Sequence, residues 1–261
     1  MAVLLLVDLD PGLTALSALG GFSVLRTGPP PDGPLPTLAR AYAGRTGPGP
    51  GERYGDPLGF RVGKVAASLR APETRIAVSV AQQGLVARLW AVALGAAALC
   101  DRVPDLAPGL LRWDPDGAAP DDLWLSEVRP LPVASLADVV VEGHLVPLTA
   151  ALRARYTVAP RLLWGNAGAA LAGAVRQLDR WSREAGRPDV ARRARALAAG
   201  LLAGPSLSGT LDPVTLRRRS CCLYYRLPGG GLCGDCCFDR PPRPAGGRSG
   251  TPRSSPTAAS G

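Results

Sequence analysis

The sequence predicts an α+β fold: a predominantly helical domain with a small antiparallel β element and a C-terminal cysteine-rich metal-binding loop. Apolar residues recur at helical spacing through much of the chain, two short alternating segments lie between turn formers, and five of the six cysteines gather near the C-terminus. A chain of 261 residues with 46% hydrophobic content can bury one sizeable core. We therefore expect a single domain over residues 1–240 and a disordered tail over 241–261.

The first part of the chain predicts an irregular connection followed by a core helix. Residues 28–59 are loaded with Gly and Pro, which oppose regular structure. From residue 62 to 99 the pattern is helical, and Arg88 lies off the apolar face. The longest charge-free apolar run, 89–100, is too short to cross a bilayer and predicts a buried helix. The apolar face carries Leu85, Leu89 and Val92.

A hairpin and a second helical region are expected next. Segments 111–114 and 123–126 alternate partially and are separated by turn formers, which predicts a small antiparallel hairpin. Residues 139–202 indicate helices broken at Pro160 and around 186–188. One part of the helix surface after Pro160 is nearly bare, so that a neighbouring backbone can approach closely. The apolar face of this helix carries Trp164, Leu171, Val175 and Leu178, and the bare part carries Gly165, Gly168, Ala169, Ala172 and Gly173.

The spacing of the clustered cysteines indicates a metal site. Cys221 and Cys222 are followed, after ten residues, by Cys233 and Cys236 in a C-x2-C spacing. Four thiolates are the ligand set of a tetrahedral zinc ion or of an iron-sulfur cluster. Directly adjacent cysteines tend to point apart, which suits two irons better than one zinc ion. The pattern favours a binuclear cluster and leaves structural zinc as the alternative.

Three stretches carry a resemblance to a known family. Residues 219–226, the glycine-rich turn 228–231 and the second cysteine pair resemble the C-terminal signature of the FhuF-like ferric-siderophore reductases. Segments 143–148 and 163–166 are also similar to that family. The chain departs from the family pattern at Cys237, where proline is frequent, so that five thiols are available for four places. The resemblance implies a [2Fe-2S] cluster bound by Cys221, Cys222, Cys233 and Cys236.

The resemblance also implies an oxidoreductase that releases iron from an imported ferric siderophore by one-electron reduction of Fe(III) to Fe(II). The cluster carries one electron, so no acid, base or nucleophile is required from the protein. Because no dinucleotide or phosphate-loop motif accompanies the cysteines, the electron must come from an external donor, either another protein or a diffusible reductant. Two alternatives stay open: a zinc-stapled binding or scaffold protein, and an iron-sulfur carrier that serves another acceptor.

Residues near the motif and upstream of it complete the candidate site. Tyr224 and Tyr225 are expected to shield the cluster from water. Arg226 is one of several flanking arginines that form either a solvated basic edge or a group that tunes the cluster or docks a partner. Candidate substrate-binding residues lie further upstream, although the single histidine more simply has a structural hydrogen-bonding role and the asparagine can bridge helices. These candidates are His144, Trp164 and Asn166; the other flanking arginines are Arg217, Arg218, Arg219 and Arg240, and Cys237 belongs to the cluster environment.

Charge and compartment limit the partners. The net charge of +9 comes almost entirely from dispersed arginine, with Lys64 the only lysine, which argues against nucleic-acid binding. This charge favours negatively charged catecholate complexes of iron over neutral or positive hydroxamate complexes. The apolar start, residues 2–7, lacks a basic flank and meets Asp8 at once, so we expect no secretory signal and a cytoplasmic protein with reduced thiols. It would act alone or at the periphery of a membrane siderophore importer.

Overall fold

The computed structural model describes residues 11–30, 33–44 and 53–242. The expected disordered tail, apart from its first two residues, and the apolar start both lie outside these ranges. The helices are α2 (Pro11–Leu16), α3 (Leu38–Ala43), α4 (Pro57–Ser68), α5 (Thr74–Cys100), α6 (Val146–Arg155), α7 (Pro160–Glu184) and α8 (Pro188–Ala203). A π-helix, η4 (Asp138–Leu145), leads directly into α6, and short helical turns are η1 (Ser17–Leu19), η2 (Gly21–Ser23), η3 (Val133–Ser135) and η5 (Tyr224–Arg226).

The strands are short and form two small sheets. They are β1 (Arg26–Thr27), β2 (Arg102–Pro104), β3 (Leu111–Trp113), β4 (Leu123–Leu125) and β5 (Pro130–Pro132). Strands β3 and β4 pair antiparallel with Arg112 opposite Trp124, which confirms the predicted hairpin. Strand β1 joins β4 in parallel, and β2 pairs antiparallel with β5. The predicted α+β class, mainly helical with a small antiparallel element, is confirmed.

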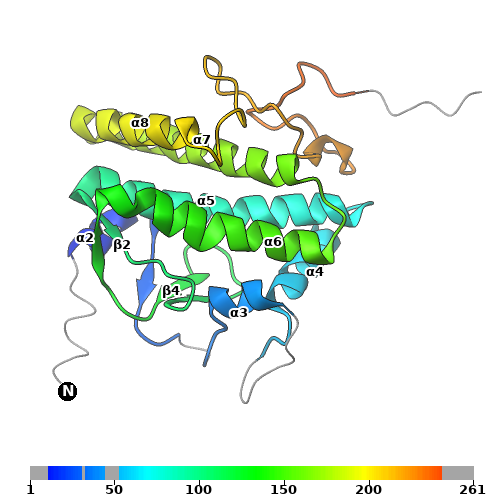
Figure 1. Cartoon of the computed structure of the whole chain (residues 1–261), viewed down its shortest axis with the longest axis horizontal. Coiled ribbons are helices and arrows are strands. Elements are labelled where there is room, and N and C mark those ends of the chain that lie inside the picture. The colour runs from blue at the N-terminus through cyan, green and yellow to red at the C-terminus, as the bar shows by residue number, and fades with distance from the viewer. Residues whose placement is uncertain (1–10, 31–32, 45–52, 243–261) are drawn as a thin grey trace, which may run out of the picture.

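Helix α5 lies at the centre of the molecule. Helices α7 and α8 cover one side of it, and the strands and α3 lie on the other (Figure 1). The buried core extends from Leu16 to Leu207 as one cluster. The predicted breaks at Pro160 and around 186–188 are confirmed, since Pro160 is the first residue of α7 and α8 begins at Pro188.

Two helical stretches are long and apolar enough to cross a membrane by length and composition, Thr74–Cys100 and Val133–Arg155. In α5, 72% of the most apolar window is buried inside the protein, as expected of a core helix. The corresponding value for the second stretch is 39%. The expectation of a buried helix over 89–100 is confirmed, and the helix is longer than this run because it continues through Arg88.

Arg88 is buried, although the sequence places it off the apolar face of this helix. Its side chain is buried, and its Nε donates to Asp122 Oδ1 over 2.8 Å. Its Nη1 and Nη2 donate to backbone carbonyls of residues 21–24, including Val24 at 2.8 Å. A buried guanidinium is tolerated when its charge is paired and its N–H groups are bonded, which is the case here. Helix α5 is therefore enclosed on this side as well.

The segment 28–59 is less irregular than its composition predicts. Helix α3 forms within it because Thr37 caps its N-terminus, accepting a hydrogen bond from the Arg40 N–H over 3.3 Å. Leu38 and Ala41 bury one side of this short helix in the core. Helix α4 likewise begins before the segment ends, at Pro57.

His144 lies in the core between two hydrogen-bond partners. Its Nε2 lies 2.6 Å from the Leu106 carbonyl and must donate to it, so its Nδ1 accepts from the Tyr42 hydroxyl at 2.9 Å. Burial lowers the pKa of His144 from 6.5 to about 4, so the imidazole is neutral in the folded protein. The interpretation favoured from the sequence, a structural hydrogen-bonding histidine, agrees with this position.

Acid should destabilise the protein through His144. Between pH 6.5 and about 4 the unfolded chain binds a proton that the folded protein rejects, so the free energy of unfolding falls as pH decreases through this window. The loss should approach ~3 kcal/mol at its low end. Urea unfolding at several pH values should show this slope, and His144→Gln should reduce it. Because the chain has one histidine, its imidazole NMR signal can be assigned directly; titration near pH 6.5 in the folded protein would contradict the account.

Candidate metal centre

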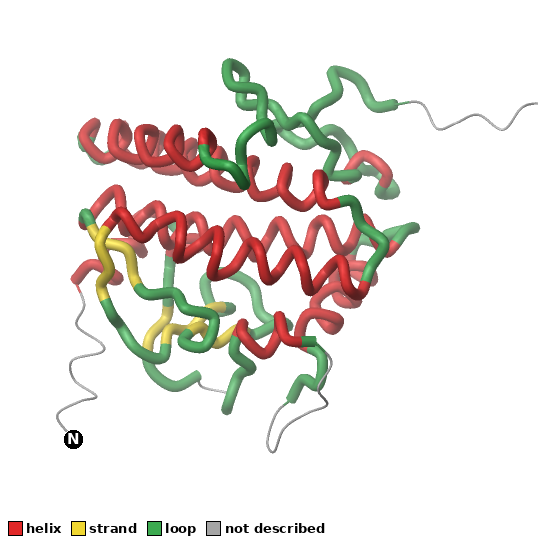
Figure 2. The backbone as a smooth tube through the Cα atoms, viewed as in Figure 1, coloured by secondary structure: helices red, strands yellow, loops and turns green. Residues whose placement is uncertain are grey.

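The motif cysteines lie in a loop, residues 217–240, that we call the cysteine segment. It covers the N-terminal half of α7 and contains only one short helical turn, η5 (Figures 1 and 2). The predicted turn between the two cysteine pairs is present: the Gly230 N–H donates to the Leu227 carbonyl over 2.8 Å. A Cβ at Gly230 would overlap with the Tyr224 carbonyl oxygen, so only glycine fits there. This turn brings the second pair back to the first.

The thiols lie in pairs. Sγ of Cys222 is 3.5 Å from Sγ of Cys233, close to the ~3.8 Å expected for two thiolates on one tetrahedral ion with 2.3 Å bonds. Cys221 instead interacts with Cys237, so the adjacent cysteines do point apart. All of these thiols are free. Among the described residues, no group of three or more His, Cys, Asp or Glu side chains converges as on a single ion, so the arrangement does not resemble a preformed mononuclear zinc site.

The thiols differ in how readily they ionise. The hydrogen bond with Cys233 lowers the pKa of Cys222 to about 6, and the charge of Arg218 acts in the same direction. The same hydrogen bond raises the pKa of Cys233. Burial raises the pKa of Cys221, and it raises that of Cys237 to about 11. The Cys222 thiol therefore ionises more readily than those of Cys221, Cys233 and Cys237, which must lose their protons if they bind a metal.

Arg218 holds the cysteine segment together from inside. Its side chain is 1% exposed, and its Nε donates to Asp235 Oδ2 over 2.9 Å. Its backbone N–H donates to the Asp235 carbonyl, also at 2.9 Å. Because Asp235 lies between Cys233 and Cys236, this ion pair ties the second cysteine pair to the stretch of chain that leads into the first.

A buried polar network continues from Arg218 into the helices. Nη1 of Arg218 donates to Asn166 Oδ1 over 2.5 Å, and Asn166 Nδ2 donates to Gln82 Oε1 and to the Ser79 carbonyl on α5. The Ser79 hydroxyl donates in turn to the Cys222 carbonyl over 2.8 Å. The network therefore bonds to both halves of the motif: to Cys222 of the first cysteine pair through Ser79, and to Asp235, between the cysteines of the second pair, through Arg218. Asn166 is fully buried, which places this candidate substrate residue beneath the site and makes it a bridge between α5, α7 and the cysteine segment.

One nitrogen of this network is free to serve a bound group. Nη2 of Arg218 is buried and has no hydrogen-bond partner among the described residues, although the Arg218 charge acts on both Cys222 and Cys233. An unpaired buried N–H is costly, so it is expected to have a partner when the site is filled. Paired thiols with a buried donor beside them fit an iron-sulfur cluster, whose sulfurs accept such bonds.

The bare surface of α7 receives the cysteine segment and the loop before it. A Cβ at Gly165 would overlap with Oγ of Ser220, and a Cβ at Gly168 would overlap with Oγ1 of Thr210. The Ser220 hydroxyl also donates to the Arg161 carbonyl over 2.8 Å. The predicted close approach is present at Gly165 and Gly168, where side-chain oxygens rather than a neighbouring backbone come nearest, and it is absent at Gly173.

The aromatic and basic residues that flank the motif cysteines differ in their contacts. Tyr224 is half exposed, whereas Tyr225 packs edge-on against Phe238 at 5.8 Å between ring centres. Arg226 lies over the Tyr225 ring, and its Nη1 forms an ion pair with Glu73 Oε1 over 2.6 Å. Glu73 is the residue before α5. Arg217 donates to the carbonyls of Cys236 and Phe238. Of the flanking arginines, Arg219, Arg226 and Arg240 are exposed.

Sequence analysis missed the polar network and did not single out Ser79, Gln82 or Asp235. A signal was present, because Ser79 and Gln82 interrupt an otherwise apolar stretch of α5. Buried polar residues in such a stretch normally have hydrogen-bond partners, and partners as distant as Asn166 cannot be read from spacing. The remaining candidates are separated: Trp164 is partly buried at the start of α7, while His144 hydrogen-bonds to Tyr42 and Leu106 in the core.

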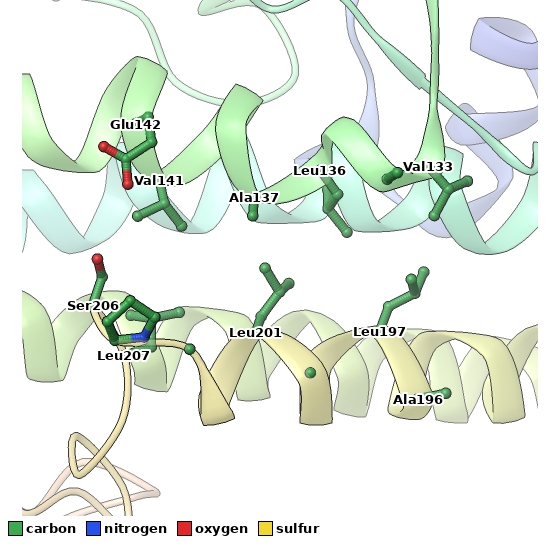
Figure 3. Close-up of a pocket in the computed structure, with 14 residues that line it drawn as sticks. Val133, Leu136, Ala137, Val141, Glu142, Ala196, Leu197, Leu201, Ser206 and Leu207 are labelled. Atoms are coloured by element: carbon green, nitrogen blue, oxygen red, sulfur yellow. The ribbon is translucent and has the colours of Figure 1, made fainter.

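Two cavities differ in their relation to this centre. One, of about 360 Å³, lies between the η3–η4 region and α8 and is lined mainly by apolar side chains (Figure 3). Glu142 is its only charged lining residue, and it contains no cysteine. The other, of about 760 Å³, lies where α6 leads into α7 and is lined by Cys221. Of these two cavities, the second is the one that meets the cysteine segment.

Comparison with family models gives two matches. Residues 69–221 match the ferric iron reductase FhuF-like transporter family, which is more than half of the chain. Residues 218–238 match the FhuF 2Fe-2S C-terminal domain, which includes both cysteine pairs. No curated protein matches the chain. The resemblance stated from the sequence is confirmed, and the matched domain indicates a [2Fe-2S] cluster.

The close approach at Gly165 can be tested by a double-mutant cycle. Gly165→Ala should destabilise the protein by about 1–3 kcal/mol, because Ser220 must rotate away and lose its bond to the Arg161 carbonyl. Ser220→Ala alone should cost about 1 kcal/mol. The double variant should cost less than the sum, since removing the Ser220 hydroxyl leaves room for the new methyl group. Chemical unfolding measures all three free energies.

Gly173→Ala is the matched control on the same helix. A Cβ there meets only the end of the Arg176 side chain, at 3.8 Å, so this substitution should be neutral or stabilising through helix propensity. Equal destabilisation by Gly165→Ala and Gly173→Ala, or strict additivity in the cycle, would show that the cysteine segment does not rest on this surface.

Proposed function

Because the chain belongs to the FhuF-like family of ferric iron reductases and carries that family's 2Fe-2S domain, we propose that it releases iron from an imported ferric siderophore by one-electron reduction. The observation that carries the proposal is the meeting of both motif cysteine pairs in one loop beside an open cleft. Hard oxygen chelators bind Fe(III) very tightly and Fe(II) much less tightly. Adding one electron therefore frees the metal.

We assign Cys221, Cys222, Cys233 and Cys236 as the cluster ligands. The short distance between Cys222 and Cys233 supports their binding of one metal, and the family motif favours Cys236 over its neighbour Cys237 for the remaining place. When bound, the cluster supplies a one-electron carrier. Residues of the protein position the cluster and tune its reduction potential.

Arg218 contributes a fixed positive charge beside Cys222 and Cys233, held by Asp235 and Asn166. Such a charge favours thiolates and any additional negative charge at the centre. Backbone N–H groups act in the same direction: Leu223 donates to Sγ of Cys221 over 3.3 Å, and Phe238 donates to Sγ of Cys236 over 3.4 Å. These interactions support a raised reduction potential, which eases acceptance of an electron from the external donor.

The reaction is placed in the cytoplasm, where thiols stay reduced. The donor is a separate redox protein or a diffusible reductant, since the sequence carries no dinucleotide motif. The protein works alone or at the periphery of a siderophore importer.

The function is tested by single-turnover reoxidation. Protein reduced with dithionite and freed of excess reductant should be reoxidised by a ferric siderophore, with one ferrous ion trapped by a ferrous-specific chelator for each cluster. Absorbance of the cluster and of the trapped complex measures both sides of the stoichiometry. Protein that stays reduced with catecholate and hydroxamate complexes, yet reduces another redox protein readily, would be an electron carrier for a different acceptor.

The ligand set is tested by single Cys→Ser substitutions. Replacing any one of Cys221, Cys222, Cys233 and Cys236 should remove most of the iron and visible absorbance, since serine offers a harder oxygen donor. Cys237→Ser and Cys100→Ser are the controls and should retain the cluster. Loss of colour in the Cys237 variant with retention in the Cys236 variant would shift the assignment by one residue.

A further inference from the structure

A basic cleft lies against the cysteine segment. It has a volume of about 760 Å³, within the usual range of small-molecule sites, and opens between the end of α6, the start of α7 and residues 219–223. Four arginines line it: Arg75, Arg153, Arg161 and Arg219. Cys221 also lines it, so the cleft reaches one of the thiols assigned to the cluster. A ligand in the cleft therefore lies beside the redox centre.

The charge of the cleft is largely uncompensated. No Asp or Glu lines it, and Arg153, Arg161 and Arg219 make no ion pair with any described residue. Arg75 is paired with Glu73 at 2.5 Å, and the charge of Arg219 is shared in part with Asp212, whose pKa it helps to lower. The N-terminus of α7, at Pro160, adds the positive end of a helix dipole at the same wall. The cleft thus favours an anion.

We propose that the basic cleft binds the ferric substrate and selects complexes of net negative charge, such as iron held by three catecholates. This inference rests on the proposed function and specifies its substrate class. One electron from the external donor passes at the Cys221 end of the motif to the ferric ion, which leaves as ferrous iron. No bond to the protein forms, and the chelator oxygens released from the metal take up protons from water. Neutral and cationic hydroxamate complexes bind poorly because they carry no net negative charge that could pair with the arginines.

The other cavities fit this substrate less well. The apolar cavity beside α8 carries only Glu142 as a charged residue, which would repel an anion. A smaller cavity of about 240 Å³ shares Arg161 and Arg219 with the basic cleft and is lined by Trp164. Trp164 therefore lines the cavity next to the basic cleft, and the two cavities meet at Arg161 and Arg219.

Gallium(III) complexes separate binding from electron transfer, because gallium(III) has the charge and coordination of ferric iron and is not reduced. Calorimetry or tryptophan quenching should give at least tenfold tighter binding of gallium tris-catecholate than of gallium tris-hydroxamate, falling as ionic strength rises. The double variant Arg153→Gln/Arg161→Gln should weaken tris-catecholate binding by tenfold or more and leave tris-hydroxamate binding unchanged. Arg180→Gln, an exposed substitution near the far end of α7, is the matched control and should change neither.

Thermal melting and iron content should show that all variants fold and hold the cluster. Equal affinity for the two complexes, absence of binding, or equal effects of the cleft and control variants would overturn the proposal. Failure of the proposed function gives a different result: tight, charge-selective gallium binding in a protein that reduces no ferric complex. Reduction of ferric complexes without charge selection would support the proposed reductase activity and contradict the assignment of the basic cleft as the selective binding site.

Discussion

The buried guanidinium of Arg218 joins the cysteine segment to the helices beneath it. A charge buried at this depth is stable only with a charged partner and bonded N–H groups, which Asp235 and Asn166 provide. Asn166 in turn requires Ser79 and Gln82 on α5. The position of the motif cysteines therefore depends on how α5 and α7 pack, although none of the four belongs to either helix. Polar contacts inside the protein therefore hold this loop in place, together with the packing of Leu223 against the core and the burial of Leu227.

The small residues of α7 complement this network. Gly165 and Gly168 let Ser220 and Thr210 approach α7 closely, on the helix that also carries Asn166, the partner of Arg218. The same packing leaves the basic cleft open on the other side of Ser220, between the cysteine segment and the end of α6. The packing of the cysteine segment on α7 thus gives a close approach along one side of the helix and an open cleft at its start. The cleft lies beside the motif cysteines, where ferric iron would be reduced.

Features that depend on local sequence pattern are predicted from the sequence, whereas features that depend on contacts between residues far apart in the chain are not. The cysteine spacing, the hairpin, the helix breaks and the bare surface of α7 are local, and the structure or the family matches confirm them. The burial of Arg88, expected only to lie off the apolar face, and of Arg218, expected as flanking charge, does not follow from the sequence, because the partners Asp122 and Asn166 lie 34 and 52 residues away in the chain. Helix α3 was missed because one capping threonine outweighs a Gly- and Pro-rich composition. The ligand assignment and the cytoplasmic location stay predictions.

The central claim is that the two cysteine pairs hold one binuclear iron-sulfur cluster, with the buried polar network beneath it. Metal and acid-labile sulfide analysis of anaerobically purified protein, combined with EPR after reduction by dithionite, tests this most directly. A [2Fe-2S] cluster would give two irons and two sulfides per chain, and an EPR signal from a single unpaired electron that appears only on reduction. One zinc ion per chain, no sulfide and no signal in either state would contradict it and would make the cysteine segment a structural zinc loop.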